Sequence, residues 1–344
     1  MQTNYRKTYL AAAFAATCIM FLFTATPAVA GPWLPPQSAT AEKQEAETEK
    51  SEAPEEATPE LKVRKPISSD GELKWKFTKG QQLDVNVEQS TTMAMSASGR
   101  DMNTVTSATN SLSMTIDNID DKGVASATST INRMKLTTTP PFGPKIEYDS
   151  AAEEEAEGVG AQFAGMLEPM IGKPMTQKMT STGKIYDVEI PEEALEGMKS
   201  AGPGMGQMFS KRTFEEMVTK SSIEFPESGI EVGKSWSVAA DINMGPMPVK
   251  TDTRYEYRGV ADVDGKPYHI INASISMSFP ENPAGAEIKI LKEKADLVYY
   301  FDGNAGRLAK TTLDQKVEME IKVAGQEMKQ TILQKMVTKM TEKN

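Results

Sequence analysis

The chain is nearly devoid of cysteine and histidine. Its 344 residues include one cysteine, Cys18, and one histidine, His269. Cys18 lies in an apolar N-terminal run that we expect to be removed, so the remaining chain has no thiol. This excludes a disulfide, a zinc–thiolate site and a cysteine nucleophile from the remaining chain. The fold must therefore be stabilised by the burial of apolar surface.

A single histidine leaves little scope for acid–base or metal chemistry. A Ser-His-Asp arrangement would depend on His269 alone, and no G-x-S-x-G motif precedes a predicted helix. Its neighbours Tyr268, Ile270 and Ile271 indicate a strand, where a hydrogen-bonded histidine is more common than a base or a metal ligand. We therefore expect no enzyme, no catalytic residue, no metal site and no cofactor. A carboxylate pair for glycoside hydrolysis depends on spatial proximity, so the sequence leaves it open.

Two segments resemble ligand-binding loops but lack the required spacing. Residues 229–235 (GIEVGKS) have three residues between the glycines, where a phosphate-binding loop needs four. Residues 262–265 (DVDG) begin like a calcium loop, but the later ligands and the bidentate glutamate are missing. Basic residues are also not clustered, which argues against a nucleic-acid partner.

Residues 1–30 predict a signal peptide. Arg6 and Lys7 precede an apolar run over residues 10–23, and residues 28–30 (AVA) supply small residues for cleavage. The run is shorter than the ~20 residues that span a bilayer. We therefore expect no transmembrane anchor after cleavage and an extracytoplasmic location, either periplasmic or secreted.

The rest of the chain divides into a spacer and a folded domain. Residues 31–66 are rich in Glu, Ala, Thr and Pro and predict a disordered acidic spacer. Residues 67–344 predict a β-rich domain. They form either one sheet or two sheets, of residues 67–222 and 223–344, that share helices within residues 153–220.

A period of two dominates the predicted domain. In residues 83–97 the odd positions are mostly apolar and the even positions mostly polar, as in a strand with one buried face. The same alternation recurs over residues 313–323 and 328–340. Residues 264–265 (DG) predict a tight hairpin turn. The phase of the alternation changes between Ile290 and Ala295, which predicts a β-bulge.

Helical periodicity is confined to the middle of the chain. Residues 159–170 and 205–218 carry apolar side chains at helical spacing, and Pro191 opens a short helix between them. Pro169 is expected to kink or end the first helix. The pattern favours a β-rich α+β fold, built as a long-stranded antiparallel curved sheet or half-barrel with a few central helices.

Methionine is unusually frequent, with 22 residues in the chain. Met93, Met95 and Met102 lie close together, and thioethers are soft ligands for Cu(I). The methionines are nevertheless spread over strands and helices at core positions. They therefore form a solid core, an adaptable lining for an apolar or lipid-like ligand, or a copper site. If they line a site closed by the helices, its residues are Phe163, Met166, Met170, Met205, Met208 and Phe209.

Two turn motifs resemble those of an uncharacterised family of exported bacterial proteins of the planctomycete type. They are TSTGKIYDVEIPEE, at residues 180–193, and FPESGIEVGKSW, at residues 225–236. The architecture is also similar to the half-barrel carriers of lipoproteins and lipids in bacterial envelopes. These resemblances transfer no functional residues, since the motifs are structural turns.

The sequence thus predicts an exported, non-enzymatic protein of the cell envelope that binds an apolar or lipid-like ligand between sheet and helices. The alternative is a structural or interaction protein whose core is completely filled. A methionine-based copper protein is the third interpretation.

Overall fold

The computed structural model describes residues 61–97, 99–154, 156–199, 211–220, 222–244, 247–279, 287–323 and 326–343. The predicted signal peptide, most of the predicted spacer and residues 200–210 lie outside the described residues. Within the described ranges, no helix is long and apolar enough to cross a membrane.

Strands make up most of the described chain. They are β1 (Gln82–Ala97), β2 (Arg100–Ile119), β3 (Ala125–Thr139), β4 (Ile146–Asp149), β5 (Pro174–Met179), β6 (Ile185–Glu189), β7 (Ser235–Met244), β8 (Met247–Val263), β9 (Lys266–Ser278), β10 (Glu287–Asp302), β11 (Arg307–Val323) and β12 (Gln326–Glu342). The helical elements are η1 (Ser68–Asp70), α2 (Val159–Leu167), η2 (Glu168–Met170), α3 (Glu192–Lys199) and α5 (Lys211–Thr219).

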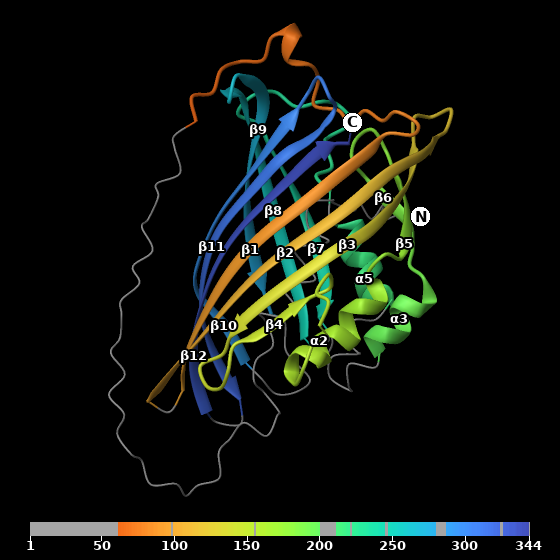
Figure 1. The fold of residues 1–344 in the computed structure, drawn as a ribbon. Coiled ribbons are helices and arrows are strands. Elements are labelled where there is room, and N and C mark those ends of the chain that lie inside the picture. Colours follow the sequence, from red (N-terminus) through yellow and green to blue (C-terminus); the bar gives the residue numbers. More distant parts are fainter. Residues whose placement is uncertain are drawn as a thin grey trace, which may run out of the picture.

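These strands form one antiparallel sheet of twelve strands within the described chain. The order is β6-β5-β3-β2-β1-β12-β11-β10-β9-β8-β7, and β4 pairs with β3 beside this path. Strands from both sides of the helical segment therefore belong to a single sheet, joined where β1 pairs with β12. The sheet is curved and not closed, which confirms the predicted fold class. Figure 1 shows β1, β2 and β3 in front of β7 and β8.

The helices lie where the sheet remains open. The edge strands are β6 and β7, and α5 contacts both of them. The buried residues Phe214, Met217 and Val218 of α5 have the spacing of one helical face. Helices α2 and α3 pack against each other and against η2 beside β4, and Figure 1 shows all three α-helices grouped together.

Local predictions from the sequence agree with the observed elements. β1 alternates as expected, with Leu83 and Val87 buried on the inner face. The register of β10 against β11 shifts between Ile290 and Lys292, where the phase change predicts a bulge. The turn between β8 and β9 has φ of 53° at Asp264 and 76° at Gly265. Positive φ at both central residues is the geometry of a type I′ hairpin.

Proline sets the helix boundaries. α2 ends at Leu167, and Pro169 lies in the 3-10 turn that follows it, which confirms the expected interruption. α3 begins at Glu192, directly after Pro191, also as expected. Of the third predicted helical run, residues 211–218 belong to α5, and its first part lies outside the described residues.

Candidate ligand-binding cavity

A cavity of about 100 Å³ lies against the concave face of the sheet. Seven strands supply its wall, namely β1, β2, β3, β5, β6, β11 and β12. Trp75, which precedes β1, and Val218 of α5 complete the lining. Three lining side chains on the inner face of the sheet keep some accessible surface because they border this space: Val85, Leu112 and Met175.

The space results from an uneven distribution of side-chain size across the interior. Over β8 and β10 the core holds stacked and edge-on aromatic rings, including Trp236 on Tyr255 at 5.1 Å and Phe225 on Phe301 at 5.0 Å between centroids. The wall of the cavity contains Trp75 as its one described aromatic residue, and it carries short side chains such as Ser129, Thr311, Thr338, Val85 and Val87 between longer methionine and leucine side chains. Short side chains on a curved sheet leave empty volume here. In the other half of the interior, the aromatic rings fill the corresponding space.

Residues 70–77, which we call the cap segment, cross one end of the sheet interior. The Trp75 amide donates to the Ser181 carbonyl (2.8 Å), and the Lys76 amide donates to the Gly306 carbonyl (2.9 Å). The cap segment therefore links the β5–β6 turn to the β10–β11 turn. The Trp75 indole is buried and meets the Phe301 ring edge-on, with centroids 5.6 Å apart.

The first turn motif noted in the sequence contacts Trp75 and also the start of the second motif. The indole N–H of Trp75 donates to the Ile223 carbonyl (3.4 Å), and the Phe225 amide donates to the Thr182 carbonyl (2.8 Å). Gly183 has φ of 97°, and a Cβ there would lie 2.2 Å from the Ile223 carbonyl oxygen. Glycine at this position of the TSTGK turn thus allows the Trp75 indole and the Ile223 carbonyl to lie close to the backbone of the turn.

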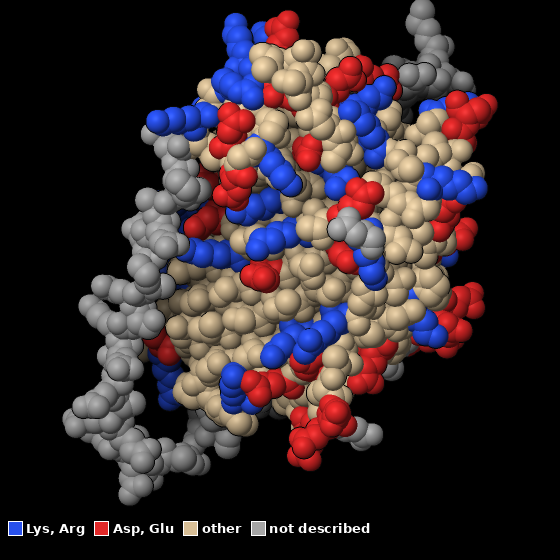
Figure 2. Space-filling model, turned by 45° about the horizontal axis from the view of Figure 1, so that its top comes forward, with Lys and Arg blue, Asp and Glu red and all other residues tan. Residues whose placement is uncertain are grey.

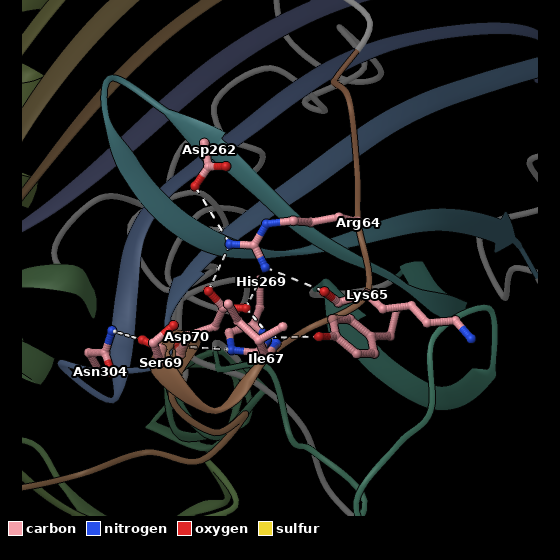
Figure 3. Close-up of polar contacts among 9 residues, drawn as sticks. Arg64, Lys65, Ile67, Ser69, Asp70, Asp262, His269 and Asn304 are labelled. Atoms are coloured by element: carbon pink, nitrogen blue, oxygen red, sulfur yellow. Dashed lines mark hydrogen bonds and ion pairs between the residues drawn. The ribbon is translucent and has the colours of Figure 1, made fainter.

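Asp70 anchors the cap segment (Figure 3). Its carboxylate is 1% exposed and accepts two hydrogen bonds from the Arg64 guanidinium, at 2.6 and 2.8 Å. The Ile67 amide also donates to it, at 2.7 Å. The hydrogen bond from Arg64, opposed by burial, lowers the pKa of Asp70 to about 2. This pairing is the fork geometry that suits arginine and a carboxylate.

His269 connects Asp70 to strand β8, as Figure 3 shows. Its Nε2 lies 3.2 Å from the Asp70 carbonyl oxygen, and its Nδ1 lies 2.6 Å from the Tyr257 hydroxyl. A carbonyl only accepts, so Nε2 carries the proton and donates, while Nδ1 accepts from Tyr257. Burial lowers the pKa of His269, which favours this neutral form.

This arrangement leaves His269 no nitrogen for a substrate. Both ring nitrogens are hydrogen-bonded, and a Cβ on Gly303 would lie 2.5 Å from Nε2, so backbone closes against the ring. The cluster of Arg64, Asp70, Tyr257 and His269 fastens the cap segment to β8 and β9. His269 is thus the hydrogen-bonded strand residue that its sequence context favours.

Three of the six predicted ligand residues lie within the described chain, and they lie away from this cavity. Met166 and Met170 are buried in the main core, and Phe163 packs against that core. None of the three lines the cavity, because α2 and η2 pack on α3 and β4 instead. Met205, Met208 and Phe209 lie outside the described residues. Four other methionines do line the cavity: Met114, Met175, Met179 and Met340.

A second set of methionines lies in a separate apolar cluster. Met93, Met277, Met319 and Met328 pack there with valine and isoleucine side chains. The Met93 sulfur accepts a hydrogen bond from the Gln330 amide at 2.6 Å. The described residues contain no group of three or more His, Cys, Asp or Glu side chains that could hold a metal ion.

The charged side chains are mixed on the face shown in Figure 2. Lysine and arginine alternate there with aspartate and glutamate, and neither sign forms a continuous patch on this face. A phosphate backbone is bound by clustered positive charge. This face therefore offers no obvious nucleic-acid surface.

Comparison with known proteins gives a family and distant fold similarities. Residues 122–304, more than half of the chain, match the model of a family described as "Family of unknown function (DUF6263)". No curated protein matches the chain. The chain is similar to lipovitellin, in a structure titled "Lipid-protein interactions in lipovitellin", with 13% identity, a TM-score of 0.37, and coverage of 78% of this chain and 26% of that one.

Two outer-membrane proteins show weaker similarity. The COG4313 outer membrane channel from Pseudomonas putida F1 has 7% identity and a TM-score of 0.22, covering 78% of this chain and 97% of that one. OpdQ from Pseudomonas aeruginosa has 6% identity and a TM-score of 0.22, covering 76% of this chain and 99% of that one.

Proposed function

Since the chain belongs to DUF6263, a family of unknown function, we propose its role from its geometry: it is an exported, non-enzymatic binding protein of the cell envelope that takes an apolar ligand into the cavity beneath Trp75. The observation that carries this proposal is the cavity itself, an apolar space walled by seven strands and covered by the cap segment. The export and the envelope location rest on the predicted signal peptide of residues 1–30.

The size of the cavity limits the ligand. An engineered apolar cavity of about 150 Å³ binds benzene, which has six non-hydrogen atoms, so a cavity of about 100 Å³ admits a group of roughly four, such as the end of an alkyl chain. Pockets for whole small molecules usually measure about 300–1,000 Å³. A longer acyl chain therefore enters only if lining side chains move.

The methionines of the lining make such movement inexpensive. Met114, Met175, Met179 and Met340 are unbranched, with several rotatable bonds, and their thioethers are polarisable. A wall of this kind can repack around ligands of different length. This use of methionine supports an adaptable lining, in which all four described methionines belong to strands.

Trp75 supplies a direct test, because its indole lines the cavity. The chain has three tryptophans, so the variant Trp33→Phe/Trp236→Phe leaves Trp75 as the only indole. We expect its emission to shift on titration with 1-hexanol, and native mass spectrometry of protein from its own organism to show a bound small molecule. Val85→Phe, which fills the cavity, should weaken binding at least tenfold.

Met166→Leu is the matched control, since Met166 is buried in the core without lining the cavity. It should leave binding unchanged. If Trp75 does not respond to apolar ligands and the native mass is that of the bare chain, the proposal fails. The alternative of a structural protein with a filled core would then account for the data.

A further inference from the structure

A row of polar side chains crosses the inner face of the sheet at the cavity. Thr311 of β11 lies directly opposite Thr338 of β12, and Thr338 lies opposite Val87 of β1. Val87 in turn lies opposite Asn110 of β2. The four residues form one line across four adjacent strands, and three of them are polar.

The polar atoms of this row have no protein partner. Asn110 is 2% exposed, Thr311 1% and Thr338 5%. Neither amide atom of Asn110 and neither threonine hydroxyl forms a hydrogen bond with any described residue. Buried polar groups are nearly always paired, because burying one without a partner is costly. Three such residues in one row therefore indicate a partner that the described part of the chain does not supply.

Three of the four residues of the row belong to the cavity wall. Thr311, Thr338 and Val87 line the cavity, whereas Asn110 is the direct neighbour of Val87 behind the lining. A molecule that occupies the cavity thus contacts apolar surface on most sides and reaches the two threonine hydroxyls on one side.

The described lining contains one cation, and this cation is directed to an aromatic ring. Among the described lining residues, Lys310 alone is ionisable, and its ammonium group lies over the Tyr300 ring, 5.5 Å from the centroid. Lys310 pairs in register with Tyr300, which belongs to a separate cluster with Ala261 and Ile270. The hydroxyls of Thr311 and Thr338 can both donate and accept hydrogen bonds, so they suit an uncharged group that does the same.

We propose that the ligand of this cavity is amphipathic, with a short alkyl part and an uncharged end group, such as an alcohol or a primary amide, that is bound by Thr311 and Thr338. This inference rests on the proposed function and assigns the ligand class. Apolar contacts with the strand wall supply affinity, and the polar row selects the end group.

Four ligands of matched length test the inference by titration of the single-tryptophan variant. They are 1-hexanol, hexanamide, heptane and hexanoate at pH 8. Heptane has the shape of 1-hexanol with a methyl group in place of the hydroxyl. We expect 1-hexanol and hexanamide to bind about tenfold more tightly than heptane, because each gains hydrogen bonds that the buried row otherwise lacks. Hexanoate should bind most weakly, since the one cation of the described lining, Lys310, lies over the Tyr300 ring and does not compensate the charge of the carboxylate.

Thr311→Val/Thr338→Val should remove the preference for the polar ligands while heptane still binds. Thr109→Val makes the same isosteric change on the exposed outer face of β2 and should keep the preference. If the double variant does not fold, Thr338→Val alone should reduce the preference in the same direction.

The possible outcomes separate this inference from the function on which it rests. If heptane binds wild-type protein as tightly as 1-hexanol, the polar row is satisfied by water or by nothing, and the inference is wrong although the cavity binds ligands. If hexanoate binds most tightly, a cation selects the ligand and the inference is also wrong. If none of the four binds, the proposed function itself fails.

Discussion

Gly183 and Trp75 are in direct contact across the cap of the cavity: a Cβ on Gly183 would lie 2.6 Å from the Trp75 indole nitrogen. Gly183 also has φ of 97°, a conformation that L residues rarely adopt. The turn between β5 and β6 and the tryptophan over the cavity are therefore coupled through this one position.

Gly183→Ala should destabilise the fold by about 3 kcal/mol, because it combines backbone strain with a collision against Trp75 and the Ile223 carbonyl. Urea unfolding measures this loss. Gly229→Ala is the control: Gly229 has φ of 72° but open space around its Cβ position, so strain alone should cost about 1 kcal/mol. Equal losses in the two variants would show that Trp75 does not depend on Gly183.

The ion pair between Arg64 and Asp70 should make stability depend on acid pH. The pKa of Asp70 falls from 3.8 to about 2 in the folded chain. A carboxyl group with a lowered folded pKa stabilises the fold above its unfolded pKa and loses that contribution as pH falls to the folded value. The free energy of unfolding of the wild type should therefore exceed that of Asp70→Asn by about 2 kcal/mol above pH 4. This difference should vanish near pH 2.

Urea unfolding of both variants at several values between pH 5 and pH 2 measures this excess. Asp262→Asn is the control, because Asp262 is exposed and lies 3.7 Å from the same guanidinium. Exposed pairs contribute about 0–1 kcal/mol, so its difference from wild type should be small throughout. If the wild type remains more stable than Asp70→Asn at pH 2, Asp70 is not a buried, ionised carboxylate.

Tyr257→Phe should leave the Nδ1 atom of His269 without a hydrogen-bond donor inside the fold. The Tyr257 hydroxyl and Nδ1 are 2.6 Å apart and buried. An unsatisfied buried acceptor costs about 1–3 kcal/mol, and thermal or urea unfolding should show a loss in this range. Tyr268→Phe is the control, since Tyr268 is only partly buried and belongs to a different cluster. If Tyr257→Phe is as stable as the wild type, a water molecule must donate to the Nδ1 atom of His269 instead.

Local features of this fold follow from the sequence because they depend on neighbouring residues. The alternation in β1, the interruption at Pro169 and the turn at Asp264 and Gly265 each reflect the steric properties of a few adjacent residues. The bulge near Ile290 is also visible as a change of phase. A one-sided pattern of this kind predicts a curved sheet with a buried face.

The candidate site depends on register and could not be predicted in the same way. The cavity brings Val85 of β1 beside Met340 of β12 and places Trp75 over residues more than a hundred positions away. Helical spacing of Met166 and Met170 correctly indicates a buried face, but periodicity does not distinguish a filled core from a cavity lining. The signal present in the sequence was weaker: threonine and asparagine at inward positions of otherwise apolar strands.

Phe214→Ala should loosen the contact of α5 with both edge strands. Phe214 is 1% exposed in the helix that contacts β6 and β7. Removal of a buried phenylalanine side chain costs about 3–5 kcal/mol. Hydrogen exchange should then increase first in β6 and β7, whose outer backbone groups lose their cover. Exchange that rises uniformly over the sheet would argue against a local closing role for α5.

Thr338→Val should stabilise the ligand-free protein by about 1 kcal/mol, because it replaces a buried hydroxyl without a partner by a methyl group of similar size. If the polar row binds the end group of a ligand, the same variant should bind 1-hexanol more weakly while its affinity for heptane is unchanged. Urea unfolding and titration of Trp75 emission measure the two effects. Thr109→Val, on the exposed outer face of β2, should change neither property appreciably. A Thr338→Val variant that is less stable than wild type would mean that the hydroxyl is already satisfied in the ligand-free protein, and the polar row would then need no ligand.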